Sequence, residues 1–541
     1  MASHELELTN SGFLVNPTKT RPVATRASSS SNNSHSATSR EKDLEKLDQQ
    51  DRTAFPDDLG TPSEKNDIEY HYLEFDTPLP DPDDSDKLMR GLSAPPEPPD
   101  LKRFVSPYTW PTARKRFIII VSVIATGAAA FSAGSYAPGV AQMSQEWGIS
   151  EVAALVGITI FTCGFGVAPM VLAPFSEING RKPVFLATGV LFIVCQACCA
   201  ATQSYGGMLA ARFLVGVGGS TFSTMVGGIV SDIYSAKDRN TPMALFSGAA
   251  LLGTGLGPLT CGYIAEYTTW RWIFGMQAIL DAIIVGVVAV TFRETRGSVL
   301  LSRRAARLNK YYEAREAAGY DTMAMVLAPE KPEVKTPRRI RWKVRADEER
   351  VSLLQMIKIS LVRPFHLLFT EPVIFWFSLW VSFSWAILYL TLAAVPLVTE
   401  TTYNFSLSQA NSVFAAMVIG SIIAAVGSIY QEQCSKQNGI ARFLTSQSKS
   451  PERRLFFCCA ESLFMVVGLF MFGWTAMPNI HWIAPSIAIA FATIGIFSIY
   501  LAVFNYLADA YVQYASSALA AQSFCRNLLG ALQKPMNKHR Q

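Results

Sequence analysis

A short polar turn between two apolar segments carries a compact group of charged residues. It reads Glu177-Ile178-Asn179-Gly180-Arg181-Lys182, which places one acid and two bases around a glycine. Charges at this spacing can form ion pairs between neighbouring helices that exist in one conformation and break in another. We therefore predict a conformational latch at Glu177, Gly180, Arg181 and Lys182.

Two ionisable residues lie inside apolar segments, where a charge is costly and usually has a function. Asp281 lies near the middle of its segment, so its carboxyl could take up a proton, and a structural pair is the alternative. Arg212 lies close to the outer end of its segment, and a side chain that reaches water there is the alternative. Glu461 lies about six residues into its segment. Three other acids fall at segment ends, where capping or solvated roles are expected: Asp232, Glu266 and Asp509.

A run of glycines and one proline lies within a third segment. The spacing of Gly253, Gly257, Pro258 and Gly262 lets neighbouring backbones approach closely, and the proline removes one helix hydrogen bond. The run predicts a bent helix at an interface between helices. A kink that serves packing alone is the alternative.

Aromatic and amide side chains are frequent in two later segments. Their ring faces suit hydrophobic or cationic cargo, although lipid-facing positions are common for such residues. The candidates for a substrate cavity are Trp376, Trp380, Trp385, Tyr389, Tyr500, Asn505 and Tyr506. The six histidines and nine cysteines show no metal-ligand spacing, and we expect no metal, no cofactor and no nucleic-acid partner.

Ten apolar segments must position these residues. The chain has 541 residues, of which 50% are hydrophobic and only 16% charged. The apolar residues gather in blocks of about 20, the length that crosses a bilayer core. The predicted spans are 117–138, 153–173, 184–202, 207–230, 243–265, 272–292, 373–398, 410–430, 455–476 and 482–507.

Lys and Arg in the short connections set the predicted orientation. Basic residues alternate with basic-free loops along the chain, which places the N-terminus in the cytoplasm. Arg271, near an outer end, is the exception. The sequon at Asn404 then falls in an outer loop and is a glycosylation candidate.

Five regions follow from composition. The first hundred residues hold 10 Lys+Arg against 20 Asp+Glu, which predicts a disordered acidic tail. The connection after the sixth span holds 17 Lys+Arg against 9 Asp+Glu, and its amphipathic pieces suit either the inner leaflet or a solvated linker helix. The predicted regions are a tail at 1–106, six helices at 107–292, a basic cytoplasmic loop at 293–370, a curtailed second half at 371–532 and a polar tail at 533–541.

These motifs resemble the major facilitator superfamily. Glu177, Gly180, Arg181 and Lys182 match its helix 2–3 signature, whereas Ala173 and Phe175 depart from it. The run from Arg212 to Gly216 is similar to an element of its proton-coupled exporters, and Gly253–Gly262 to its antiporter signature, with Cys261 replacing a glycine. The approach to the first helix resembles fungal twelve-helix drug:proton antiporters, multidrug and polyamine exporters among them.

The resemblance implies an all-α, multi-pass membrane protein that is not an enzyme. It implies export of a small amphipathic or cationic compound, such as a drug, toxin or polyamine, in exchange for protons. Arg212 and Asp281 would handle the proton, and we expect a monomer in the plasma membrane. A proton-coupled importer and a non-transporting truncated product are the alternatives.

The C-terminal region departs from the family pattern. Residues 515–532 begin like an eleventh helix but meet Lys534, Pro535 and a basic end. We predict that this segment lies at the inner face or inserts only partly, after ten full spans. No twelfth span is expected, which is why a truncated product is considered.

Overall fold

Ten long apolar helices form the body of the chain. The computed structural model describes residues 68–80, 96–235, 238–318, 339–348, 353–437, 452, 455–511 and 515–536. Within these residues, ten helices are long and apolar enough to cross a membrane, which confirms the predicted spans. The first six comprise α3 (Thr112–Gly134) with η3 (Ala137–Gly139) and α4 (Val140–Trp147), α5 (Glu151–Asn179), α6 (Arg181–Ala201), α7 (Tyr205–Ile233), α8 (Asn240–Tyr267) and α9 (Trp270–Thr291). The other four comprise α13 (Pro372–Tyr403), α14 (Leu407–Ser412) with α15 (Ala415–Gln437), α17 (Leu455–Glu461) with α18 (Leu463–Thr475), and α19 (Ile483–Ala510).

Serine caps define where several spans begin. Ser150 and Ser204 accept hydrogen bonds from the backbone N–H groups of Ala153 and Gly207, at the starts of α5 and α7. Ser406 forms a capping box with Gln409 at the start of α14, after exposed Asn404 ends α13 in the left-handed conformation. These caps satisfy N–H groups that the first helical turn leaves without partners.

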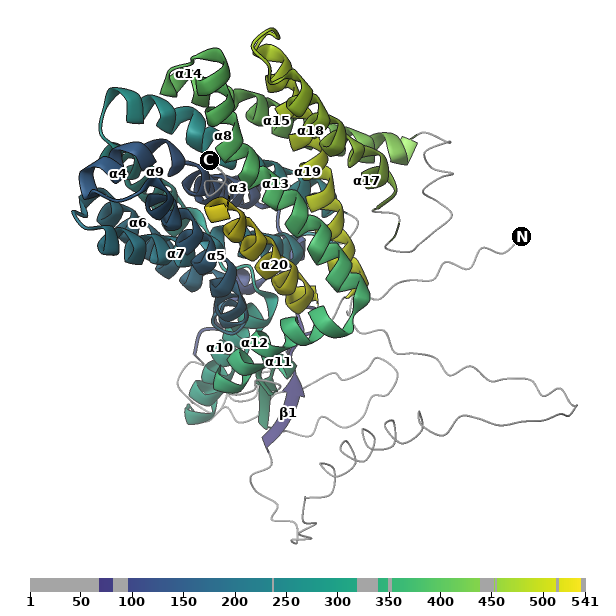
Figure 1. Cartoon of the computed structure of the whole chain (residues 1–541). Helices are drawn as coiled ribbons and strands as arrows, with labels where there is room; N and C mark the ends of the chain where they lie inside the picture. Colours follow the sequence, from purple (N-terminus) through teal and green to yellow (C-terminus); the bar gives the residue numbers. More distant parts are fainter. Residues whose placement is uncertain are drawn as a thin grey trace, which may run out of the picture. The chain divides into compact units, whose positions relative to one another are not determined.

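The helices form two sets that contact each other at both ends of the bundle (Figure 1). We call the end that bears α14 the α14 end, and the opposite end, which bears the long central connection, the α10 end. At the α14 end, the Tyr263 hydroxyl lies 2.8 Å from the Ser412 hydroxyl, and the Glu266 carboxylate accepts a hydrogen bond from the Ser408 backbone. Glu266 therefore joins the two halves, which is more specific than the predicted capping or solvated role.

Arg271 has a local explanation. Its guanidinium pairs with the Glu146 carboxylate at 2.6 Å and stacks over the Trp270 ring at 4.4 Å. Lys and Arg gather in the cytoplasmic connections of membrane proteins. Because Arg271 is neutralised by a nearby acid, it conflicts little with this rule.

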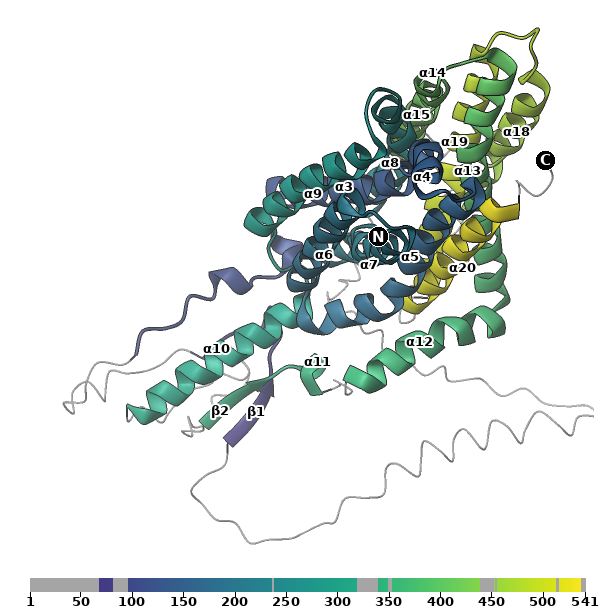
Figure 2. The same ribbon diagram turned by 60° about the vertical axis from the view of Figure 1, so that its left-hand side comes forward.

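A small subdomain lies beside the bundle at the α10 end. Figure 2 shows α10 (Gly297–Ala317) next to strands β1 (Ile68–Tyr72) and β2 (Arg339–Lys343), which pair in parallel. Its separate core comprises Leu73, Ala305, Leu308, Tyr312, Ile340, Trp342 and Val344. The shorter helices here are η1 (Lys102–Phe104), η2 (Pro107–Thr109), α11 (Arg345–Glu348) and α12 (Leu353–Thr370).

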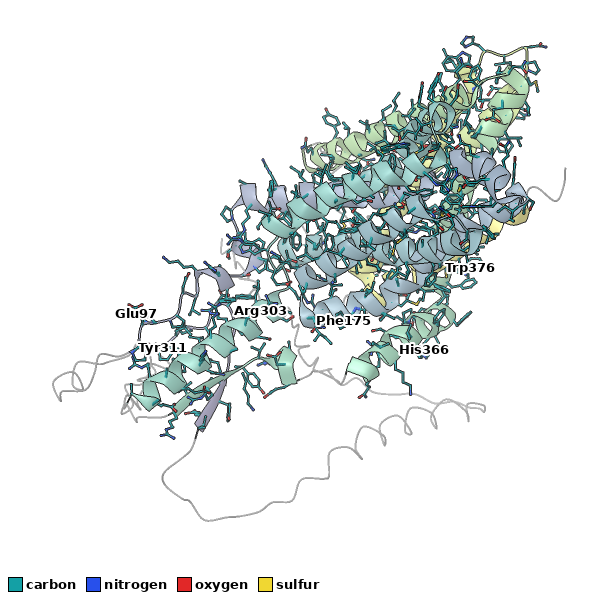
Figure 3. All side chains as sticks on the ribbon, turned by 90° about the vertical axis from the view of Figure 1, so that its left-hand side faces the viewer. Glu97, Phe175, Arg303, Tyr311, His366 and Trp376 are labelled. Carbon is teal, nitrogen blue, oxygen red and sulfur yellow. The ribbon has the colours of Figure 1, made fainter. Side chains whose placement is uncertain are left out.

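Polar contacts join α10 to β2 within this subdomain. Asn309 exchanges two hydrogen bonds with the backbone of Trp342, at 2.8 and 2.9 Å. Arg341 makes a two-pronged ion pair with Glu316, at 2.7 and 2.8 Å. This hydrogen bond holds the pKa of the Glu316 carboxyl below its usual range. In Figure 3, Arg303 and Tyr311 mark α10 outside the bundle, and His366 marks α12.

The subdomain corrects two expectations. The tail predicted to be disordered at 1–106 contains β1 and one short helix, η1, in its C-terminal part, and its residues 1–67 and 81–95 lie outside the described residues. The apolar face of α10 is covered by β2 and Leu73 rather than left free for a membrane surface. Both corrections arise because strands about 270 residues apart pair with each other.

The last described helix packs inside the bundle. Helix α20 (Ala515–Met536) runs along α13 and α5, and a side chain at Gly530 would meet the Tyr389 ring at 2.5 Å. This packing differs from a helix lying at the inner face, which was one of the two expected arrangements, partial insertion being the other. The hydropathy of α20 is low because it contains polar residues such as Gln522 and Asn527. The packing nevertheless buries both of these side chains.

Candidate functional site

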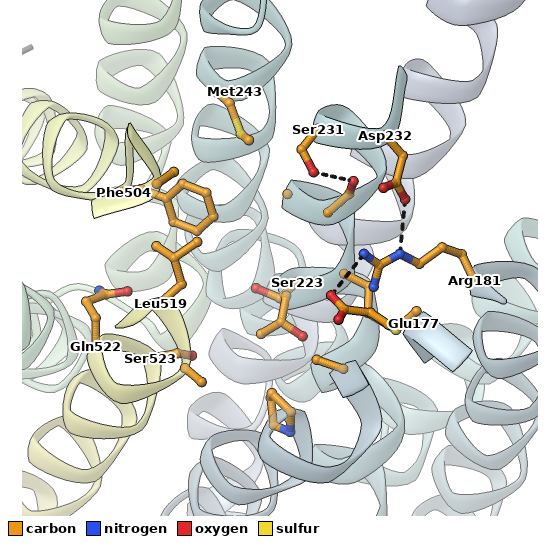
Figure 4. Close-up of a pocket in the computed structure, with 18 of the residues that line it drawn as sticks. Glu177, Arg181, Ser223, Ser231, Asp232, Met243, Phe504, Leu519, Gln522 and Ser523 are labelled. Carbon is orange, nitrogen blue, oxygen red and sulfur yellow. Dashed lines mark hydrogen bonds and ion pairs between the residues drawn. The ribbon is translucent and has the colours of Figure 1, made fainter. Parts of the chain in front are cut away.

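A cavity of ≈ 490 Å³ lies between the two halves at the α10 end. Figure 4 shows Glu177, Arg181 and Asp232 on one side of it, and Phe504, Leu519 and Gln522 on the other. The first group comes from α5, α6 and α7, and the second from α19 and α20. Both halves therefore contribute to one internal space, an arrangement typical of a binding site for a small molecule.

Two acids and two arginines form an ion-pair cluster at the edge of the cavity. Arg181 is 3% exposed and donates from Nε to Asp232 at 3.2 Å and from Nη1 to Ser176 at 2.7 Å. Glu177 lies 3.5 Å from Arg181 and 3.9 Å from Arg296, and Arg296 also pairs with Asp232 at 3.2 Å. These carboxylates outweigh the effect of burial and raise the pKa of Arg296. The four charges compensate one another, as buried charges require.

The cluster differs from a latch between halves. Each of its described ion pairs joins residues of the N-terminal half, from α5 through the residues that follow α9. Sequence reasoning missed Arg296 and assigned Asp232 an end-of-helix role, because neither residue is near the turn in sequence.

Glu294 organises the turn itself. Its carboxylate accepts hydrogen bonds from the backbone N–H groups of Arg181 at 2.8 Å and Lys182 at 3.3 Å, at the start of α6. Gly180 has φ of 100°, and a side chain there would collide with the Glu294 carboxylate. A glycine is therefore needed on both steric and conformational grounds. The Lys182 ammonium points elsewhere and donates to the Ala289 carbonyl at 3.1 Å.

Arg212 is fully buried within the N-terminal half, so it does not reach water at the membrane edge. Its guanidinium lies over the rings of Phe161 at 4.5 Å and Tyr136 at 4.7 Å. Both terminal nitrogens lie 3.4 Å from the Ser132 carbonyl, and Nε has no partner among the residues that the structure describes. Cation–π contact therefore provides much of its stabilisation.

Asp281 is buried in α9 with 3% exposure. Within the described part of the chain, its side chain makes no hydrogen bond or ion pair, and Oδ2 is sequestered without a partner. The structure therefore does not bring Asp281 and Arg212 into contact, and it shows no structural partner for the carboxyl among these residues.

The glycine run lines the interfaces of α8. A side chain at Gly257 would meet the Phe131 carbonyl at 2.7 Å, so α3 and α8 are in backbone contact there. Gly253 lies against the Gly127 carbonyl in the same interface, while Gly262 faces Asn411 of the other half. Pro258 lies within the helix and touches Gly134. The run thus joins α3 and the second half to opposite sides of α8.

The aromatic candidates separate into groups. Tyr500 lines the cavity, and its ring lies 4.9 Å from buried Trp385. Tyr389 is buried beside Gly530, and Asn505 lies 3.3 Å from the Asn240 side chain.

The remaining aromatic candidates lie away from the cavity lining. Trp380 and Tyr506 each pack on Phe377. Trp376 is 64% exposed on the outside of α13, contrary to its predicted place in the cavity. The helical rotation of about 100° per residue turns this ring away from the cavity.

Sequence reasoning also missed Arg526. It lies on α20 in the segment that was expected to insert only partly, yet it lines the cavity. Its guanidinium lies over the rings of Trp385 at 4.5 Å and Tyr500 at 5.0 Å. An arginine as the one charged residue in the sequence from 515 to 532 was the available signal.

Two packed helical halves around an internal cavity define a class of polytopic membrane transporters. The sequence profile of the Major Facilitator Superfamily matches residues 122–533. The chain belongs to this superfamily, a family of transporters rather than enzymes, as predicted from its motifs.

Several fungal relatives are similar over most of the chain. The transporter paaT of Penicillium rubens is 32% identical over 79% of this chain and 73% of its own length. The efflux pump FUB11 of Gibberella moniliformis is 31% identical over 78% of this chain and 66% of its own. The multidrug transporter mdrA of Aspergillus fumigatus is 30% identical over 79% and 66%. The chain thus spans about two thirds of the length of the latter two.

The fold is shared with a solved bacterial transporter. The proton:xylose symporter XylE matches with a TM-score of 0.54 and 13% identity, over 80% of this chain and 90% of that one. At this identity the likeness concerns the fold alone.

Proposed function

We propose that this chain exports a small amphipathic compound across a membrane in exchange for protons. The observation that carries the proposal is the cavity between the halves at the α10 end, which is lined by residues of both halves. An alternating-access transporter holds its cargo in such a space and opens it to one side at a time. Relatives named as efflux pumps support the outward direction.

Proton coupling is assigned to Asp281, with Arg212 as a fixed charge in the same half. An isolated charged carboxylate at this depth is costly, so Asp281 would be protonated while it is buried. It would release the proton when water reaches the side chain. Arg212 has no such freedom, because a guanidinium keeps its proton. Its contacts with rings and the Ser132 carbonyl would then depend on how α3, α5 and α7 pack.

The ion-pair cluster would serve as a latch in the opposite conformation. It faces α20 across the cavity, so closure of the α10 end would bring Gln522 and Leu519 toward Glu177 and Arg181. In the present conformation the cluster stiffens the N-terminal half, and Gly257 and Pro258 shape the interface on which α8 moves.

Of the predicted cargo classes, we retain the amphipathic compound rather than the polyamine. Both carboxylates that line the cavity, Glu177 and Asp232, are engaged by Arg181 and Arg296. Four arginines line the same space: Arg181, Arg239, Arg296 and Arg526. This excess of positive charge disfavours a polycation.

We further propose a monomer in the plasma membrane, with the α10 end in the cytoplasm. This orientation rests on the basic connections and on exposed Asn404 at the opposite end. Modification of Asn404 by a glycan, lost in the variant N404Q, would place that end outside.

Direction and coupling are tested in sealed vesicles whose cytoplasmic face points outward. The fluorescent probes are rhodamine 6G, a cation, and 8-anilinonaphthalene-1-sulfonate, an anion. Export predicts that one of them accumulates when the lumen is acidic, and that collapse of the pH gradient with nigericin abolishes the accumulation. The variant D281N serves as the matched control, with a side chain of similar size that carries no exchangeable charge.

An importer would give the opposite movement. Vesicles preloaded with probe would then lose it faster when the lumen is acidic, because proton and cargo would leave together. No gradient-dependent movement of either probe, with the protein present and folded, would refute the proposal.

A further inference from the structure

Two buried donors on α20 face the cavity without a described partner. Arg526 is 3% exposed, and its Nε has no acceptor. Gln522, one helical turn earlier on the same face, is also buried, and its Nε2 has no acceptor. Both residues line the cavity. Buried donors normally have partners, so this pair indicates that an acceptor is missing from the site.

The two cavity carboxylates do not fill this role. Asp232 and Glu177 pair with Arg181 and Arg296, and neither lies within ion-pair distance of Arg526. The charge of Arg526 therefore persists in the cavity without a counter-ion among the described residues. A ligand that carries negative charge would be stabilised there relative to a neutral or cationic one.

The orientation of the guanidinium specifies the shape of the acceptor. The rings of Trp385 and Tyr500 lie 4.5 and 5.0 Å from its central carbon. These rings therefore contact the guanidinium through stacking. Such contacts use none of the N–H groups, which point outward in the guanidinium plane. A carboxylate accepts two parallel hydrogen bonds from this edge, and the Gln522 amide can donate a third.

The apolar lining suits an aromatic body attached to that carboxylate. Phe504, Leu519 and Met243 line the same cavity, together with Tyr500. Rings stacked on Phe504 or Tyr500 would be desolvated as the carboxylate reaches Arg526.

We propose that the cavity binds small aromatic carboxylates through Arg526 and Gln522. This inference rests on the proposed function, since it names the substrate class of the same cavity. It concerns binding, however, and is independent of the direction of transport and of proton coupling.

The test measures binding to the purified full chain in detergent by isothermal titration calorimetry. Three probes share one ring system: 2-naphthoate, 2-naphthamide and 2-naphthylmethylammonium. We expect 2-naphthoate to bind at least about tenfold more tightly than the amide, and the ammonium compound to bind more weakly than the amide. Equal affinities for the three probes would overturn the proposal without reference to any variant.

Variants then assign the selectivity to residues. We expect R526Q to lower naphthoate affinity by about 10- to 100-fold while leaving naphthamide affinity nearly unchanged. R526K should retain part of the preference, because it keeps the charge but loses the planar fork. Q522L should lower naphthoate affinity less than R526Q does.

The control variant is R303Q, which removes an exposed arginine of α10 outside the bundle. It should bind all three probes as the unaltered chain does. A naphthoate preference that survives in both R526Q and R526K would refute the assignment. Selective binding in a chain that moves no probe in vesicles would instead refute the proposed transport function and leave this inference standing.

Discussion

The contact between α3 and α8 predicts opposite outcomes for two glycine-to-alanine variants. A methyl group at Gly257 would lie 2.7 Å from the Phe131 carbonyl oxygen and 2.8 Å from the Ser135 nitrogen. Both contacts are with backbone atoms, so the helices themselves must separate. At Gly286, on the exposed face of α9, an added methyl group meets nothing within 4 Å.

The expected magnitude follows from two terms. Alanine favours the helix over glycine by up to about 1 kcal/mol, and this gain is common to G257A and G286A. Overpacking at a close contact costs about 1–3 kcal/mol and applies to G257A alone. The difference between the two variants therefore isolates the clash, which we place near the upper part of that range because backbone cannot rotate away.

Thermal unfolding of the purified chains in detergent measures this difference. We expect G257A to unfold at a lower temperature than the unaltered chain, and G286A at an equal or higher one. Export of probe in vesicles should fall in G257A and stay unchanged in G286A. If the two variants unfold at the same temperature, the backbone contact between α3 and α8 does not exist as described.

Three other perturbations follow from the site and the subdomain. D232N leaves buried Arg181 with a weaker partner and should lower the free energy of unfolding by about 3 kcal/mol, read as thermal stability. D281N should remove the dependence of probe movement on the pH gradient in vesicles, because the side chain no longer exchanges a proton. The lowered pKa of Glu316 should make the α10–β2 contact stable above the ordinary Glu pKa and weaken it as pH falls through the lowered value, measured as hydrogen exchange of β2 against E316Q.

Each of these has an internal control. E177Q should destabilise less than D232N, because the Glu177 pairs are longer and a third of its side chain is exposed. Gradient-dependent export in D281N would remove Asp281 from the coupling mechanism. Exchange in β2 that follows the same pH course with and without Glu316 would show that its ion pair with Arg341 does not hold the strand.

Local patterns were sufficient for the helices and for the glycine-rich turn. The length and hydropathy of each apolar block depend on the block alone, because a span must satisfy its backbone hydrogen bonds internally in lipid. The same applies to Gly180, whose neighbours Arg181 and Lys182 define the start of α6. These features were therefore predicted residue by residue.

Partners distant in the chain were not predicted. Asp232 and Arg296 complete the cluster at Glu177 and Arg181, but 51 and 115 residues separate them from Arg181. Strand β1 was missed because its partner β2 lies about 270 residues away and a five-residue strand has little local signal.

The amino-acid sequence by itself determined the class of protein, the ten spans, the family and the charged turn. Hydropathy and short motifs are properties of contiguous residues, and a bilayer imposes the same requirement on each span. Only the tertiary structure decided which charges are paired and which remain open. It placed Trp376 outside the cavity and Arg526 within it, because the direction in which a side chain points depends on how helices from the two halves pack together.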